Sequence, residues 1–365
     1  MSLKDYELIF VTRESPELPG AKYRVYNFIK ILKEEGYRAE AISYAKDLGA
    51  YSGMLEQYLS TVDKINYNLK AYFKFKQYKQ PLIIIQRFNY HSLAPLLFCL
   101  KNKIKFIYDV DDWEFRENID YFKGLFPRSK AEFLFRKTAK KATLCISGSH
   151  YLQKYITTIN SKSYYLAPGI DVELFKPSIS EGALAKNLAW VGTMFREEDY
   201  LNLKYLFEIM KDLPCLKLEV VGDGHYKNKI TAEAKRLELK NVIFRGWIDS
   251  SMIPEYLSNI SLGLFPLKVQ NRFTESKFPV KVLEFMSKGI PVVATSFGEV
   301  KNIINDKENG FLVEDKESFK SKIEMILEDS KLYSDISKSA RESIVLNYSD
   351  YSQTQKLISI LNRGL

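Results

Sequence analysis

The amino-acid sequence predicts an α/β protein with two doubly wound, Rossmann-like domains. Its 365 residues are too many for one ordinary domain and suit two of about 150 to 200 residues. Short apolar runs alternate with amphipathic helical patterns, which is typical of βαβ units and parallel sheets. A proline-containing break at 168–180 separates two such series. We therefore expect domains at 1–175 and 176–347, with the carboxyl ends of their strands facing each other across a cleft.

The expected strands fall into these two series, and each is rich in apolar and β-branched residues. Continuous apolar runs of this length indicate strands that are buried on both faces of a sheet. An amphipathic stretch follows each run of the first series. The expected strands are Leu8–Val11, Ala39–Ser43, Leu82–Gln86, Phe106–Tyr108 and Leu144–Ser147, and then Leu188–Val191, Leu218–Val221, Val242–Phe244, Ser261–Phe265, Val292–Thr295 and Phe311–Val313.

Composition narrows the class of protein. The chain is 46% hydrophobic and 27% charged, which is typical of a folded globular protein. No run approaches the roughly 18 apolar residues of a membrane span, and the N-terminus does not resemble a secretory signal. We therefore expect a cytoplasmic protein with buried thiols at Cys99, Cys145 and Cys215. The net charge of +9 lies entirely in residues 1–176, which hold 28 Lys and Arg against 19 Asp and Glu.

The most informative stretch is residues 277–295, because it reads as a helix aimed at a phosphorylated ligand. Pro279 suits the first helical position, and Gly289 ends the helix. Lys281 and Glu284 share one face. A cation in the first turn is otherwise unfavourable, so we expect Lys281 to bind a diphosphate together with the helix N-terminus. Glu284 is then placed to accept hydrogen bonds from sugar or ribose hydroxyls.

This stretch resembles the donor-binding signature of family 4 retaining glycosyltransferases. The resemblance implies the GT-B fold, a donor on the second domain and an acceptor on the first. It also implies that residues 348–365 form a helix that crosses back to the first domain. Further similar motifs are Ala-Pro-Gly-Ile-Asp-Val-Glu-Leu-Phe at 167–175, Trp-Val-Gly-Thr at 190–193, Val-Val-Gly-Asp-Gly at 220–224, Val-Ile-Phe-Arg-Gly at 242–246 and Asn-Gly-Phe-Leu-Val at 309–313.

Two departures from the family pattern concern charge at the donor. Thr193 stands where the family commonly has an arginine after the first glycine, so Arg196, Arg272, Lys277 or Lys281 must neutralise the diphosphate, and we favour Lys281. Ser276 replaces the first of two glutamates, and Glu275 beside it is a candidate substitute. The resemblance and the strand–glycine–helix pattern together predict donor contacts at Gly20, Arg24, Gly192, Thr193, Arg196, Gly222, Gly224, Trp247, Glu275, Ser276 and Lys277.

The run Asp109-Val110-Asp111-Asp112 leaves three interpretations open. Two carboxylates one residue apart after a strand could bind Mg²⁺ or Mn²⁺, as in the unrelated GT-A transferases. They could instead cap the following loop. We prefer a third role, in which Asp109 or Asp111 orients an acceptor hydroxyl or takes its proton, because ligands bind at the carboxyl ends of parallel strands.

Basic and aromatic residues alternate in 67–78 and again in 122–141. This pattern is typical of a helix on an anionic bilayer, but core aromatics beneath a solvated basic face, or single-stranded nucleic acid, would also produce it. The resemblance favours a membrane surface over nucleic acid.

These observations predict a glycosyltransferase that needs no metal or other cofactor. It would move a hexose or N-acetylhexosamine from a nucleotide sugar to a hydroxyl of a glycan or lipid-linked acceptor, as in polysaccharide or lipopolysaccharide biosynthesis. It would work in the cytoplasm, on the inner face of the membrane, without nucleic acid as a partner. The alternatives are a catalytically weak binding module of the same fold and a metal-dependent transferase that uses Asp109 to Asp112.

Overall fold

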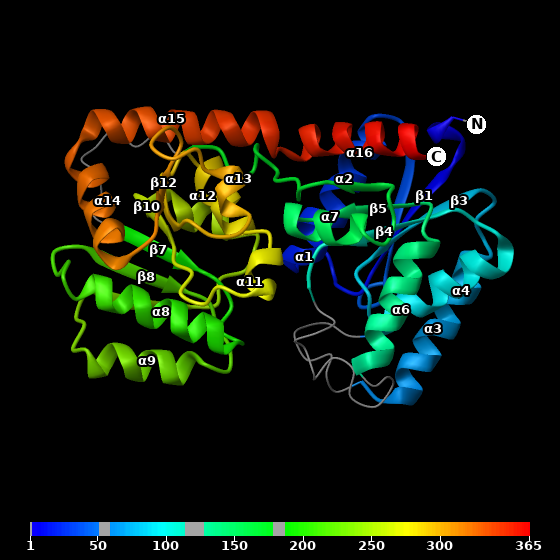
Figure 1. Cartoon of the computed structure of the whole chain (residues 1–365), viewed down its shortest axis with the longest axis horizontal. Coiled ribbons are helices and arrows are strands. Elements are labelled where there is room, and N and C mark those ends of the chain that lie inside the picture. The colour runs from blue at the N-terminus through cyan, green and yellow to red at the C-terminus, as the bar shows by residue number, and fades with distance from the viewer. Residues whose placement is uncertain (1, 51–58, 114–127, 178–186) are drawn as a thin grey trace. The chain divides into compact units, whose positions relative to one another are not determined.

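The computed structural model describes residues 2–50, 59–113, 128–177 and 187–365. The chain forms two compact units, each built on a parallel sheet of six strands (Figure 1). The first unit contains residues 1–169, 276–278 and 350–365, and the second contains the remainder. This arrangement confirms the predicted α/β fold class.

The first sheet has the strand order β2-β1-β3-β4-β5-β6, and all its strand pairs are parallel. Helices cover both faces, so β3 is buried along its whole length. One face packs on α2 and α16, and Tyr108 on the other face contacts Phe135 of α6. The elements are β1 (Glu7–Thr12), α1 (Pro19–Ala21), α2 (Asn27–Glu34), β2 (Arg38–Ser43), α3 (Thr61–Phe75), β3 (Pro81–Gln86), α4 (Leu93–Asn102), β4 (Phe106–Val110), α6 (Arg128–Lys141), β5 (Leu144–Ser147), α7 (His150–Thr157), β6 (Ser163–Tyr165) and α16 (Asp350–Gly364).

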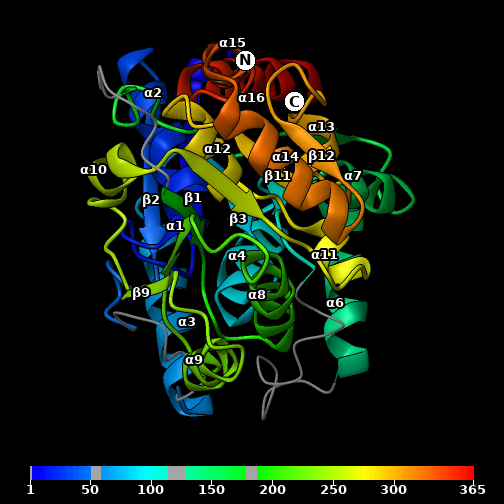
Figure 2. The same ribbon diagram turned by 90° about the vertical axis from the view of Figure 1, so that its left-hand side faces the viewer.

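The second sheet has the order β12-β11-β10-β7-β8-β9 and is also parallel. Figures 1 and 2 show α8 and α9 on one face and α12 and α15 on the other. The elements are β7 (Asn187–Val191), α8 (Glu197–Met210), β8 (Lys217–Val221), α9 (Lys227–Arg236), β9 (Val242–Gly246), α10 (Ile253–Tyr256), β10 (Leu262–Phe265), α11 (Arg272–Ser276), α12 (Val280–Ser287), β11 (Val292–Thr295), α13 (Val300–Ile303), β12 (Phe311–Val313), α14 (Lys316–Glu328) and α15 (Ser330–Asn347).

Two further observations concern membrane-spanning helices and the cysteines. Among the described residues, no helix is long and apolar enough to cross a bilayer. Cys99 and Cys145 are buried free thiols, as predicted, but Cys215 is exposed because it lies in the loop before β8 rather than in the core. The prediction of a buried thiol at Cys215 was therefore wrong.

Candidate active site

Two glycine loops leave the carboxyl ends of the neighbouring strands β7 and β8. The loops touch through their backbones, since the amide of Gly192 donates to the carbonyl of Val221 at 3.0 Å. A Cβ added to Gly222 would lie 1.7 Å from the carbonyl oxygen of Gly192. One added to Gly224 would lie 2.4 Å from the carbonyl of Met194. Gly222 and Gly224 also have φ of +138° and +154°, so side chains are excluded twice over. The two loops therefore pack closely through their backbones, with Gly222 buried and Gly192 and Gly224 half-buried beside it.

Lys281 brings a cation to the first of these loops. It is the second residue of α12, and its Nζ lies 4.7 Å from the ring centroid of Trp190 in β7. A Cβ on Gly192 would lie only 2.4 Å from this Nζ. Pro279 is the N-cap of α12 rather than its first residue, so the helix begins one residue later than predicted. The ammonium group, the glycine loop and the amino end of α12 are therefore neighbours.

Glu284 lies one turn after Lys281 and is only 9% exposed. Arg196 is the N-cap of α8, and its guanidinium lies 3.9 Å from the ring centroid of Phe273. This cation–π contact holds Arg196 close to α11, where Glu275 is half-buried.

The other predicted donor residues differ in exposure. Thr193 is exposed in the first loop, whereas Ser276 is fully buried and Lys277 is half-buried. Trp247, after β9, is 41% exposed and donates from Nε1 to Asp249 at 3.2 Å. The predicted residues that the structure brings together most closely are Gly192, Gly222, Gly224 and Lys281.

In the first unit, Asp109 and Arg24 form a buried ion pair. Arg24 Nε donates to both carboxylate oxygens of Asp109, at 3.1 and 3.0 Å, and Nη1 donates to the carbonyl of Leu166. Both side chains are almost fully buried. Burial raises the pKa of Asp109 to about 6, against the opposing effect of Arg24. These contacts point Arg24 into the unit and pair Asp109 with it, and the ligand contacts predicted for the two residues stay predictions.

Asp111 belongs to a second network, which the sequence analysis did not find. Arg87 donates from Nε to Asp111 at 2.7 Å and from Nη1 to Glu14 at 2.8 Å. Arg87 adopts a left-handed backbone, with φ of 60°, directly after β3. Such strain in a residue other than glycine is found preferentially at functional sites. The network therefore joins the carboxyl ends of β1, β3 and β4 in one charged cluster.

The environment of this cluster keeps Asp111 ionised. Burial raises its pKa, but the charges of Arg87 and Arg24 outweigh burial and hold the pKa below its usual value. A Cβ on Gly20 would lie 2.2 Å from a carboxylate oxygen of Glu14. The lack of a side chain at Gly20 therefore leaves space for the Glu14 carboxylate. Asp111 was already a candidate from the sequence. Glu14 could have been suspected only because it is a charged residue shortly after an expected strand.

The metal interpretation gains no support from the geometry. The carboxylate of Asp109 accepts from the guanidinium of Arg24, and that of Asp111 accepts from the guanidinium of Arg87. Within the described ranges, no group of three His, Cys, Asp or Glu side chains is placed to hold a metal ion.

A family model for glycosyl transferases group 1 matches residues 180–343, which include both glycine loops and Lys281. The second half of the chain therefore resembles a glycosyltransferase group 1 domain. This match and the names of the curated relatives support the class of enzyme that the sequence predicted, a glycosyltransferase.

Named relatives and solved structures agree with this class and fold. The chain is 27% identical over 218 residues to TuaH of Bacillus subtilis, named as a teichuronic acid biosynthesis glycosyltransferase, and the match covers 55% of this chain and 53% of that protein. The chain spans about half the length, or less, of the first curated relatives it matches.

Two crystal structures resemble almost the whole chain. Anabaena HepE in complex with UDP and glucose superposes with a TM-score of 0.73 at 15% identity, covering 98% of this chain and 99% of HepE. Sucrose-phosphate synthase of Thermosynechococcus elongatus superposes with a TM-score of 0.76 at 15% identity, covering 98% of both chains. At this identity the likeness shows the fold alone, which is GT-B.

Proposed function

We propose that the protein transfers a hexose or N-acetylhexosamine from a nucleotide-diphosphate sugar to a hydroxyl of a glycan or lipid-linked acceptor. The observation that carries the proposal is the position of Lys281, whose ammonium group lies against the Gly192 loop at the amino end of α12. Backbone amides, a helix N-terminus and a cation together suit a diphosphate.

The proposed role of Lys281 and the amino end of α12 is to stabilise the diphosphate as the leaving group. As the bond between the sugar and the nucleotide breaks, negative charge grows on the diphosphate, and Lys281 and α12 stabilise that charge. Glu284, one turn along, would accept hydrogen bonds from sugar or ribose hydroxyls. We infer retention of configuration from the resemblance to family 4 enzymes, with the acceptor attacking from the face that the nucleotide leaves.

On the acceptor side, the proposal now favours Asp111 over Asp109. The carboxylate of Asp109 is occupied by Arg24, whereas Asp111 belongs to the strained cluster at the carboxyl ends of the first sheet. Its lowered pKa keeps it an acceptor at neutral pH, as the orientation of a sugar hydroxyl requires. The surroundings of the acceptor are proposed to include an anionic membrane surface on the cytoplasmic side.

The two comparisons that name ligands or pathways support particular reagents for a test. HepE was crystallised with UDP and glucose, and TuaH is named for the synthesis of a cell-surface polymer. UDP-glucose and UDP-N-acetylglucosamine are therefore the first donors to try, followed by GDP sugars.

The test is calorimetric titration of the protein with UDP and GDP, together with an assay of donor hydrolysis. Lys281→Gln should weaken binding of the nucleotide diphosphate about tenfold to a hundredfold, because it removes a charged contact. Lys211→Gln, at the exposed end of α8, is the control and should bind as the wild type does. Equal affinity in the two variants would refute the donor site. Binding of UDP without any hydrolysis or transfer would favour the alternative of a binding module.

A further inference from the structure

Helix α3 exposes a stripe of large apolar side chains. Val62, Ile65, Leu69 and Phe73 are spaced by three and four residues, so they lie along one face of the helix. Their exposed fractions are 65, 51, 52 and 62%. The opposite face is buried through Ala71 and Phe75. Scattered exposed apolar residues are ordinary, but a continuous stripe of four on one helix marks an interaction surface.

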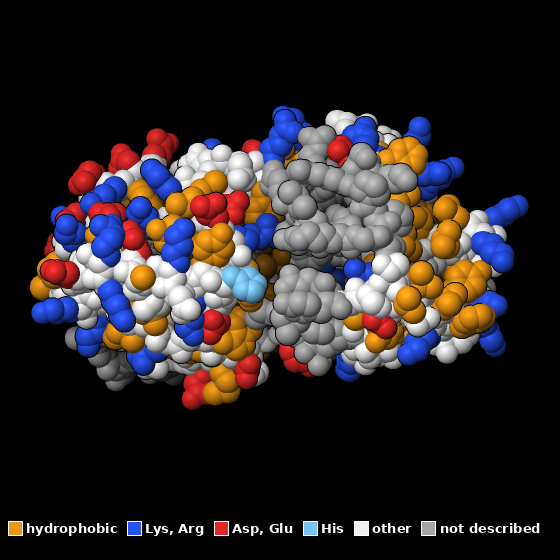
Figure 3. Space-filling model, turned by 90° about the horizontal axis from the view of Figure 1, so that it is seen from below, with side chains coloured by type: hydrophobic (Ala, Val, Ile, Leu, Met, Phe, Trp, Pro, Cys, Tyr) orange, Lys and Arg blue, Asp and Glu red, His pale blue; other side chains and the backbone are white. Residues whose placement is uncertain are grey.

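The neighbouring helix α4 extends the apolar surface. Phe98 of α4 packs against Tyr72 and Phe75, with ring centroids 5.5 and 5.4 Å apart, which fixes the two helices side by side. Leu97 and Leu100 of α4 are 60 and 45% exposed. On the right of Figure 3, where Figure 1 shows α3 and α4, hydrophobic and basic side chains alternate across the surface.

The charge of this region is extreme. Residues 60–105 contain nine Lys and Arg and a single acidic residue, Asp63. One of the nine, Arg87, pairs with Asp111 and Glu14 in the cluster described above, so eight lysines stand against Asp63 in this region. The partner of this surface must therefore be apolar and anionic at once.

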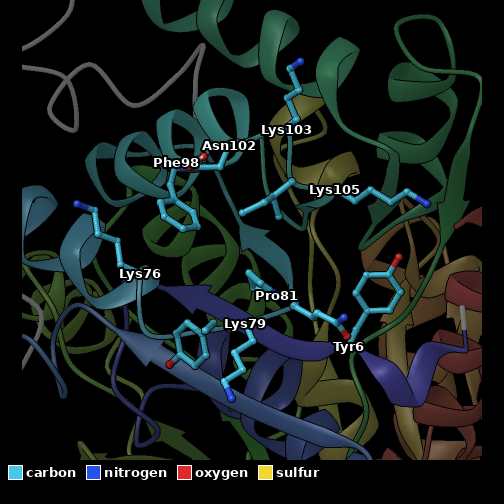
Figure 4. A pocket seen from close by; sticks show the side chains of 11 residues that line it. Tyr6, Lys76, Lys79, Pro81, Phe98, Asn102, Lys103 and Lys105 are labelled. Carbon is cyan, nitrogen blue, oxygen red and sulfur yellow. Dashed lines mark hydrogen bonds between the residues drawn. The ribbon is translucent and has the colours of Figure 1, made fainter.

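A basic pocket opens at the C-terminal ends of the same two helices. It has a volume of about 600 Å³, and Phe98 and Pro81 lie among the side chains that line it. Figure 4 shows Lys76, Lys79 and Lys103 spread around it. Pro81 begins β3, so the pocket lies at the amino ends of the strands, away from Asp111 at their carboxyl ends. It is therefore separate from the candidate acceptor cluster.

Lys76 connects the pocket to the stripe. Its Nζ lies 5.0 Å from the ring centroid of Phe73, the last residue of the stripe, and Lys76 also lines the pocket. The apolar stripe and the basic pocket are consequently parts of one surface, which we call the α3–α4 face.

We propose that the α3–α4 face docks on an anionic lipid bilayer, with the stripe inserted among the acyl chains and the pocket binding a lipid phosphate. Lys76, Lys79 and Lys103 point outward around the pocket in Figure 4, and their flexible stems allow each ammonium group to contact headgroup phosphates at its mouth. This inference deepens the membrane part of the proposed function and rests on it, but it names a surface that the donor site does not share.

The structure favours this face over α6, the other basic and aromatic stretch. Phe135 of α6 is buried, and Arg136 donates to the hydroxyl of Tyr155 at 3.1 Å. Only Phe133 among the described aromatic residues of α6 is exposed. The portion of this stretch at 122–127 lies outside the described residues.

The test is co-sedimentation of the full chain with vesicles of phosphatidylcholine, alone or with phosphatidylglycerol. The wild type should bind the anionic vesicles at low salt and be released as salt rises, because screening shortens the range of the attraction. The triple variant K76Q/K79Q/K103Q should bind about a hundredfold more weakly, since each lysine near such a surface contributes about 1 kcal/mol. K137Q/K140Q/K141Q on α6 removes the same charge and should change binding less than about fivefold.

A second pair of variants tests insertion of the stripe. Leu69→Ser with Phe73→Ser should weaken vesicle binding at least about tenfold through lost apolar burial. Val345→Ser with Leu346→Ser on α15 is the matched control, because those side chains are also exposed, at 41 and 74%. Glycerol phosphate in excess should compete with the vesicles in the wild type if the pocket holds a headgroup phosphate.

The outcomes separate this inference from the proposed function. Calorimetric binding of UDP should be unchanged in every one of these variants, and its loss would show damage beyond the docking face. Equal release by the α6 triple variant and the pocket variant would overturn the α3–α4 face as the docking surface. Absence of wild-type binding to anionic vesicles would overturn docking itself while leaving donor binding intact.

Discussion

Glu284 is a buried acid on α12, whose other buried residues are mostly apolar. In the donor site proposed for it, the Glu284 carboxylate would accept hydrogen bonds from sugar or ribose hydroxyls. Glu284→Gln keeps the shape and removes the charge, so transfer should fall about tenfold to a hundredfold with folding intact. Comparison of transfer rates and circular dichroism tests this, with Glu328→Gln in the exposed last turn of α14 as the control. Wild-type activity in Glu284→Gln would remove Glu284 from the donor site.

His91 makes the first unit sensitive to acid. It is fully buried, contacts the carbonyl of Gln86 through Nε2 at 2.7 Å, and packs edge-on against Tyr44. Burial, with smaller contributions from the charges of Arg13 and Arg87, lowers the pKa of His91 to about 3. The unfolded chain, with an ordinary pKa near 6.5, binds more protons between these values, so stability falls as pH falls through this window.

From this one group, the free energy of unfolding should be about 1.4 kcal/mol lower at pH 5.5 than at pH 7.5. Chemical denaturation at the two pH values measures the difference. His91→Gln should lose this part of the pH dependence even if it is less stable overall. An unchanged slope in that variant would assign the acid sensitivity to other residues.

Sequence reasoning identified single residues best where local pattern fixed their role. Lys281 was singled out because a cation in a first helical turn is unusual; the structure places it beside the glycine loop, and its binding of a diphosphate stays a prediction. Arg24 was predicted to contact a ligand, but its ion pair with Asp109, 85 residues away, was not predicted. Arg87 was missed because its partner Glu14 is 73 residues away. Such pairings arise from the order of strands in the sheet, which no local pattern contains.

At the scale of elements, the contact between the two glycine loops should be indispensable. Gly222→Ala would force a Cβ to within 1.7 Å of the carbonyl oxygen of Gly192 and also strain a backbone with φ of +138°. The loop must then move, so we expect UDP affinity to fall at least about tenfold, with a stability loss of about 1 to 3 kcal/mol. Calorimetry and denaturation would measure both effects.

Gly49→Ala separates strain from steric clash. Gly49 has φ of +69°, but nothing lies within 4 Å of an added Cβ. It should therefore cost about 1 kcal/mol of stability and leave UDP binding unchanged. If Gly222→Ala behaves in the same way as Gly49→Ala, the loops do not form the donor surface.

The strands were predictable as elements, and the faces of the helices were less so. All of the expected strands are present because parallel strands buried on both sides produce continuous apolar runs. Strand β6 (Ser163–Tyr165) was not predicted, since three residues carry too little pattern. On α3, sequence showed basic and aromatic residues together, but only the structure separates the buried Phe75 from the exposed Phe73.

At the scale of the whole molecule, the alternation of strands and helices sufficed to predict two parallel sheets. The order of the strands within each sheet could not be predicted from the sequence. That order contains the reversal point at which open parallel sheets bind ligands, and Asp111 and Lys281 lie at the carboxyl ends of their sheets. The uneven distribution of charge, in contrast, was visible in the sequence. Sequence located the excess in the first half, and the structure concentrated it on the α3–α4 face.

The proposed donor site also predicts whether transfer requires a divalent cation. If Lys281 and the amino end of α12 neutralise the diphosphate, no divalent cation is required there. Transfer from a nucleotide sugar should therefore persist in excess EDTA at close to the untreated rate, and added Mn²⁺ should not raise it. Lys281→Gln provides the control, because it should lower the rate with or without EDTA. Loss of transfer in EDTA, restored by Mn²⁺ in the wild type but not in Asp111→Asn, would instead establish a metal site at Asp109 to Asp112 and transfer the main catalytic role from the second unit to the first.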